Sequence, residues 1–138
     1  MSYRFSAASM ERLRTCHADL ILLATEALAD PECPFDMSIF EGHRGQERQD
    51  QLYEEGVSKV QWPNSRHNRF PSLAVDIVAY VGGPSWDWDY LDPLAVHIKA
   101  TWDRLTKDER TSGNYSLTWG GDWAWRDGAH WQLDRVGT

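Results

Sequence analysis

The chain has 138 residues, of which 41% are hydrophobic and 25% are charged, and its formal net charge is −7. This length suits one globular domain with its own core, so we expect residues 1–138 to form a single domain. The negative charge argues against a nucleic-acid-binding protein, which needs a basic face, and the longest apolar run, Leu20–Ala24, is too short to cross a bilayer.

The first predicted element is a helix that Ser6 or Ser9 caps and that ends near Ala29, where the sequence DPECP stops it. Its apolar residues follow helical spacing: Leu13, Cys16, Leu20, Leu23, Ala24, Ala27 and Leu28. The residues before it lack the apolar core of a signal peptide, so we expect the protein to be made and kept in a cytoplasm. Two cysteines, Cys16 and Cys33, are too few for a disulfide framework, and we expect free thiols.

A strand, an exposed helix and a loop are predicted next. The segment FDMSIFEG alternates apolar with polar residues over positions 35–39, which predicts a strand. The mostly polar segment GQERQDQLYEEG predicts a solvent-exposed helix that Gly56 caps at its C-terminus. Residues 57–72 are predicted to form a loop, which leads into a strand over Leu73–Val81 that GGP ends.

The rest of the chain predicts one more helix and two closing strands. The segment DPLAVHIKATWDRL begins with Asp92 as cap and Pro93 in the first turn, and its helical spacing leaves His97 in solvent. The segments YSLTWGGDW and AHWQLDR predict two short strands. Helices at the start and strands gathered late favour an α+β fold, with a small, mainly antiparallel sheet and flanking helices.

Tryptophan is frequent: the chain has eight, and five of them lie between residues 102 and 131. Large aromatic rings fill cores, and they also build clefts that hold a sugar or a peptide. We expect core packing for most of them, and an aromatic cleft is the alternative.

Asp76 is unusual because it lies inside the most strand-like run of the chain, in the sequence SLAVDIVAY. Side chains alternate along a strand, so Val75 and Ile77 share one face while Asp76 and Val78 share the other. An ionised carboxylate is costly to bury unless it is paired, protonated or bound to a metal. If both faces of this strand are covered, Asp76 needs a cation, and a metal ion is one candidate.

Two histidines could complete a metal site with Asp76. His67 lies in the loop nine residues earlier, and His130 begins a short strand late in the chain. Two histidines and one carboxylate are a familiar catalytic zinc set that leaves a fourth position open for water. Asp127, three residues before His130, could turn back as a general base. The alternative is that these are packed polar residues of the interior.

Several blocks of the chain together resemble the zinc peptidases of the D-alanyl-D-alanine carboxypeptidase type. These blocks are SRHNRFPSLAVDIV, WGGDW, DGAHWQL and FEGHRGQERQDQLYEEG, which cover separate parts of the range from Ile39 to Leu133. Within that group the chain is most similar to phage endolysins that act as L-alanyl-D-glutamate endopeptidases. The resemblance implies the small α+β fold shared by these carboxypeptidases and hedgehog-type domains.

The resemblance also implies roles for individual residues. Zinc would be held by His67, Asp76 and His130, and Asp127 would be the general base. Arg44 would steady the oxyanion of the tetrahedral intermediate or hold a substrate carbonyl. The alternative for Arg44 is an ordinary salt bridge at the start of a helix.

Two further residues enter through the same motifs. Ser65 would orient the loop or the substrate. Asp122, in GGDW, would be a partner of a ligand histidine or simply a turn residue.

The implied function is hydrolysis of a peptide bond in the peptidoglycan stem, with L-alanyl-D-glutamate as the expected bond. A D,D-carboxypeptidase or D,D-dipeptidase is one rival, and a non-catalytic, zinc-stabilised wall-binding module is another. Asp127 argues against the second rival, because a purely structural zinc site needs no base. We expect a monomer that collects in the host cytoplasm and reaches the cell wall with the help of a membrane-pore protein.

Overall fold

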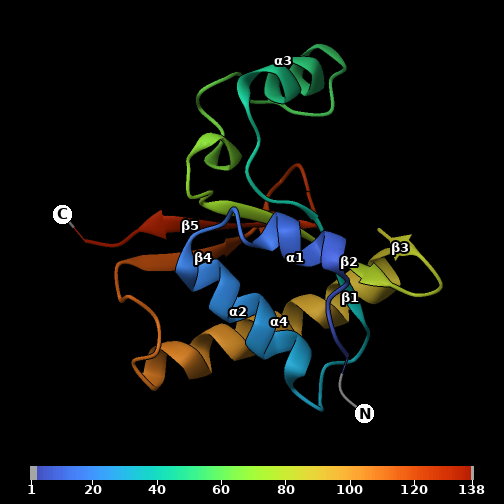
Figure 1. Ribbon diagram of the computed structural model, residues 1–138, viewed down its shortest axis with the longest axis vertical. Coiled ribbons are helices and arrows are strands. Elements are labelled where there is room, and N and C mark those ends of the chain that lie inside the picture. Colours follow the sequence, from blue (N-terminus) through green and yellow to red (C-terminus); the bar gives the residue numbers. More distant parts are fainter. Residues whose placement is uncertain (1–2, 138) are drawn as a thin grey trace.

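A computed structural model describes residues 3–137 and shows an α+β architecture (Figure 1). The helices are α1 (Ala7–Leu13), α2 (Ala18–Ala29), α3 (Gln46–Glu54) and α4 (Trp88–Lys107), with two 3-10 turns, η1 (Arg66–Asn68) and η2 (Gly120–Asp122). The strands are β1 (Met37–Glu41), β2 (Ala74–Tyr80), β3 (Pro84–Ser85), β4 (Tyr115–Trp119) and β5 (His130–Arg135). None of the helices between residues 3 and 137 is long and apolar enough to cross a membrane.

The strands form one antiparallel sheet in the order β1-β2-β5-β4, and the short β3 pairs with β2. The register places Asp76 of β2 directly opposite His130 of β5. On its other side Asp76 pairs with Glu41, after an irregularity in β1 between Ile39 and Glu41. The central strand therefore carries Asp76 between two polar neighbours.

Helices α1, α2 and α4 lie on one side of the sheet, and α3 stands on the other side (Figure 1). The core fills the space between the sheet and the first group of helices. Val75 and Ile77 of β2 belong to this core together with Trp131 and Leu133 of β5. Because side chains alternate along both strands, Asp76 and His130 face away from the core, as the sequence predicted for β2.

The prediction of one helix from Ser6 to Ala29 is wrong, because the chain breaks between α1 and α2. The backbone of Thr15 accepts a hydrogen bond from Ser72 N at 2.8 Å, and His17 N donates to Ser72 O at 2.9 Å. These bonds tie the break to the segment that leads into β2. The side chain of His17 then caps α2 by accepting a hydrogen bond from Asp19 N.

The last predicted helix also differs from the observed one. Helix α4 starts at Trp88 with Asp87 as its cap, and Pro93 lies inside it. Burial of Leu91, which is 4% exposed, extends the apolar face beyond the proline, which itself points to solvent. His97 is half-buried and bonds to Ala27 O at 2.8 Å, so the expectation that it is solvated is wrong.

Both cysteines are free and buried, as the sequence predicted. Burial raises the pKa of Cys16 to about 12 and that of Cys33 to about 11. These thiols are therefore protonated at neutral pH and serve as small apolar side chains.

Candidate active site

Three side chains from separate parts of the chain converge on the open face of the sheet. His67 comes from η1, Asp76 from β2 and His130 from the start of β5. His67 Nε2 lies 3.2 Å from Asp76 Oδ1, and His130 Nδ1 lies 3.5 Å from the same oxygen. One ligand atom of each residue lies within 4.8 Å of the others, so the three could hold a metal ion together.

Hydrogen bonds fix which nitrogen of each histidine faces the centre. His67 Nδ1 lies 2.8 Å from the carbonyl oxygen of Gly42, which can only accept, so Nδ1 carries the hydrogen. His130 Nε2 lies 2.8 Å from Gln132 Oε1, while the amide nitrogen of Gln132 donates to Asp134 at 3.0 Å. Nε2 of His130 is therefore the donor. In the neutral form, each ring thus directs a lone pair toward Asp76.

This arrangement places three hydrogen-bond acceptors around one point and requires a cation there. Burial opposes ionisation of Asp76, but the charge of His67 and hydrogen bonds from His130 and His67 hold its pKa well below the ordinary value. Burial likewise opposes a charge on His130, but its hydrogen bond to Asp76 and that carboxylate's charge raise its pKa. A proton or a metal ion can satisfy the site, and the carboxylate stays ionised in either case.

The loop that carries His67 is held by its own hydrogen bonds. Ser65 caps η1: its hydroxyl accepts from His67 N at 3.2 Å, and its own N–H donates to Asn68 Oδ1 at 3.0 Å. The backbone of Arg44 donates to His67 O at 2.7 Å, and Asn68 Nδ2 donates to Arg44 O at 3.1 Å. Ser65 therefore caps the turn that carries His67.

Arg44 is 9% exposed and makes contacts in three directions. Its Nε donates to Glu41 Oε2 at 2.7 Å, and its Nη1 donates to Gln49 Oε1 at 3.0 Å. Its Nη2 lies 3.8 Å from Asp76 Oδ2. The salt bridge proposed as an alternative is therefore present, and the same guanidinium also reaches the carboxylate of the candidate metal site.

Asp127 lies on a tight loop between η2 and β5. Its backbone N–H donates to Gly120 O at 3.0 Å, and a Cβ on Gly120 would lie 2.5 Å from Asp127 O. A Cβ on Gly128 would lie 2.7 Å from the Trp88 ring, so that glycine lets the loop sit against α4. Burial and then the charge of Asp76 raise the pKa of Asp127 above its ordinary value.

One cavity of about 590 Å³ connects these groups. His67, Asp76 and His130 line it, together with Arg44, Ser65 and Asp127. Six of the seven residues singled out from the sequence therefore surround one space.

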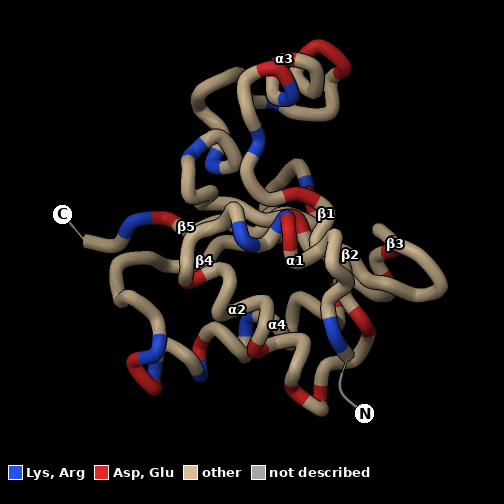
Figure 2. The backbone as a smooth tube through the Cα atoms, in the orientation of Figure 1, with Lys and Arg blue, Asp and Glu red and all other residues tan. Residues whose placement is uncertain are grey.

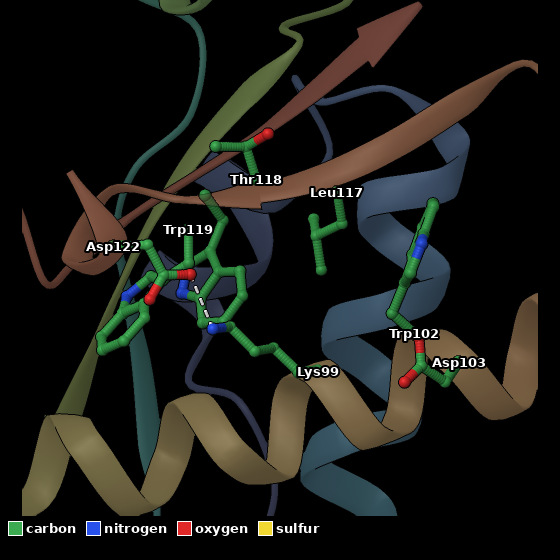
Figure 3. Close-up of a pocket in the computed structure, with 8 residues that line it drawn as sticks. Lys99, Trp102, Asp103, Leu117, Thr118, Trp119 and Asp122 are labelled. Carbon is green, nitrogen blue, oxygen red and sulfur yellow. Dashed lines mark hydrogen bonds and ion pairs between the residues drawn. The ribbon is translucent and has the colours of Figure 1, made fainter. Parts of the chain in front are cut away.

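Asp122 lies elsewhere. Its carboxylate is 2.7 Å from Lys99 Nζ of α4, and its side chain is 58% exposed. Figure 3 shows this pair beside the ring of Trp119, in a smaller cavity of about 370 Å³ on the α4 side of the sheet. Of its two expected roles, the structure provides the turn position in η2, and Asp122 does not touch a ligand histidine.

Comparison with known proteins identifies the family. The family model described as phage L-alanyl-D-glutamate peptidase matches residues 1–136. The chain belongs to this family. Among solved structures, it is similar to the L-Ala D-Glu endopeptidase ChiX of Serratia marcescens, with 34% sequence identity and a TM-score of 0.76 over 95% of this chain and 90% of that one. No curated protein matched.

Membership in the phage L-alanyl-D-glutamate peptidase family makes the chain a peptidase and confirms the resemblance seen in its motifs. The likeness to ChiX confirms the α+β fold with a small antiparallel sheet. The prediction of an endopeptidase directed at peptidoglycan is confirmed at the level of the family.

Sequence reasoning missed the residues whose hydrogen bonds hold the side chains of the site in place. Gln132 orients His130, and Glu41 and Gln49 hold Arg44. A signal for Gln132 was present, because strand alternation places it on the same face as His130. Glu41 and Gln49 lie only three and five residues from Arg44 in the sequence, but no motif marks them as its partners.

Proposed function

We propose that the protein hydrolyses the bond between L-alanine and D-glutamate in peptidoglycan stem peptides, with zinc held by His67, Asp76 and His130. The observation that carries the proposal is the convergence of two lone pairs and a carboxylate oxygen on one point. Two ligands about 2.1 Å from a tetrahedral zinc ion lie about 3.4 Å apart. The distances of 3.2 and 3.5 Å from the histidine nitrogens to Asp76 fit this value.

Zinc, when bound, polarises a substrate carbonyl and lowers the pKa of water. The chain's own groups provide the proton transfers. Asp127 faces the same cavity, and its raised pKa supports its taking a proton from the attacking water and passing it to the leaving amine. The alternative of a non-catalytic wall-binding module gives Asp127 no role.

Arg44 supplies the fixed positive charge of the site. Its guanidinium is held by Glu41 and Gln49, so it would not need to reorganise when negative charge develops on the substrate oxygen. Ser65 would act mainly by holding the loop of His67, and its place in the cavity lining also allows contact with the substrate.

Family membership favours the L-alanyl-D-glutamate bond over the D-alanyl-D-alanine bond that a D,D-carboxypeptidase would cut. We propose that the enzyme acts as an endolysin, which reaches the wall from the host cytoplasm after release. We also propose that the enzyme acts as a monomer, because the proposed catalytic and metal-binding residues line one cavity without needing a residue from a second copy.

Zinc dependence is tested by metal analysis and by chelation. Purified protein should carry about one zinc ion per chain, and stripping the metal should abolish hydrolysis that added zinc restores. His130→Ala should not regain zinc, whereas His97→Ala, which alters a histidine outside the cluster, should. Full hydrolysis by metal-free protein in chelator would overturn the proposal.

A further inference from the structure

Phe40 and Trp86 form an exposed aromatic pair at the edge of the catalytic cavity. Phe40 is 41% exposed and Trp86 is 47% exposed, and their rings meet edge to face with centroids 4.9 Å apart. Phe40 lies in β1 beside the irregularity that precedes Glu41, and Trp86 directly follows β3. Both line the same cavity as His67, Asp76 and His130.

The two ends of this cavity differ in charge. Lys59 and Arg66 line it on the side of the segment that leads into η1, whereas Arg48 pairs with Glu41, the residue after Phe40. Trp86 directly follows β3, and the chain contains no lysine or arginine between Phe70 and Ile98. Figure 2 shows Lys and Arg along the segment between α3 and β2, and none on β3.

A second exposed tryptophan, Trp125, belongs to the cationic end. The ammonium of Lys59 lies 5.3 Å from the centroid of its ring, so a cation already covers one face. The aromatic pairing of Phe40 and Trp86 involves no such cation. The cavity therefore offers an exposed aromatic pair at one end, beside a Glu41 carboxylate already paired with Arg44 and Arg48, and the cations of Lys59 and Arg66 at the other.

The proposed substrate likewise differs in charge between the two sides of the bond to be cut. In a peptidoglycan stem, the amino group of L-alanine is joined through an amide to the lactyl group of N-acetylmuramic acid, which leaves that side uncharged. The D-glutamate side carries carboxylates. A pyranose ring presents C–H groups that pack against an aromatic face, and carboxylates pair with Arg and Lys.

We propose that Trp86, supported by Phe40, is a subsite for the N-acetylmuramyl sugar that precedes the scissile bond. This inference rests on the proposed function. It assigns the substrate class as stem peptides still attached to the glycan, and it places the D-glutamate side toward Lys59 and Arg66. Trp86 then determines specificity without taking part in the chemistry.

The test compares two substrates that differ only at the sugar: N-acetylmuramyl-L-Ala-γ-D-Glu-L-Lys and N-acetyl-L-Ala-γ-D-Glu-L-Lys. The zinc-loaded enzyme should cleave the first with a kcat/KM about tenfold higher, the factor expected for burying on the order of 50 Å² of apolar surface. Trp86→Ala should remove this preference by lowering kcat/KM on the muramyl substrate only. Trp86→Tyr should retain most of it, because a ring remains.

Tyr53→Ala is the matched control, since Tyr53 is 41% exposed on α3 and does not line the cavity. It should leave both rates unchanged. The proposal is overturned if the wild-type enzyme cleaves both substrates equally, if Trp86→Ala slows both by the same factor, or if Trp125→Ala abolishes the preference instead. Failure of the proposed function looks different, because the zinc-loaded wild-type enzyme would then cleave neither substrate.

Discussion

Replacing Arg44 by alanine should destabilise the protein by about 3 kcal/mol, at the lower end of the range for breaking a buried ion pair. The change removes the partner of Glu41, whose side chain is 13% exposed, and one of the partners of Gln49. We expect the lower end because Arg48 Nε, 3.8 Å from the same Glu41 oxygen, can move closer and take over part of the pairing. For a chain of this length, the melting temperature should fall by about 10 °C.

Thermal unfolding of zinc-loaded wild type, Arg44→Ala and Arg44→Lys measures this effect. Lysine should recover only part of the loss, because one ammonium cannot bond Glu41 and Gln49 while facing Asp76. Arg48→Ala is the control: its side chain is 47% exposed, so it should shift the melting temperature by at most a few degrees. An Arg44→Ala melting temperature equal to that of wild type would refute the reasoning. If Arg44→Ala also lowers kcat and leaves KM unchanged, Arg44 has the expected role of stabilising the oxyanion.

Three further changes test the site. Asp127→Asn should keep its zinc but lose hydrolysis about 10²–10⁴-fold in steady-state assays, and loss of the metal would instead make Asp127 a ligand. Gln132→Leu should weaken zinc binding about 10–100-fold in competition with a chelator, because His130 loses the acceptor that orients it; unchanged affinity would contradict that role. The raised pKa of His130 adds stability below its unfolded pKa of about 6.5 that is lost as pH rises through the higher folded pKa. The melting temperature of chelator-treated protein should therefore fall as the pH rises above about 6.5, less so in His130→Gln, and a rise would count against this assignment.

The local pattern of the sequence predicted most elements, but it could not predict where distant segments would interrupt them. The apolar spacing from Leu13 to Leu28 is helical throughout. The break within it comes from backbone bonds between Ser72 and the segment Thr15–His17, more than fifty residues away. Similarly, Pro93 locally predicts the start of a helix. The helix instead starts at Trp88, because Leu91 is buried against the rest of the fold.

The candidate ligands could be predicted because a lone carboxylate in an apolar strand requires a partner, and because the motifs resembled a known family. Their geometry could not, since the register that sets Asp76 against His130 exists only in the folded sheet. The same holds for the support of His130, which runs from Gln132 to Asp134 and then to Arg66 and Thr118. Asp122 shows the opposite case: its motif suggested a place near the histidines, and the fold turns it toward Lys99.

The most direct test of the proposed activity is mass spectrometry of purified peptidoglycan digested by the zinc-loaded protein. Hydrolysis at the expected bond should leave L-alanine on the muramyl groups of the glycan and release peptides that begin with D-glutamate. His67→Ala protein, prepared in the same way, should release none. Release of D-alanine alone, or stem peptides left intact by the zinc-loaded wild-type protein, would contradict the proposed activity.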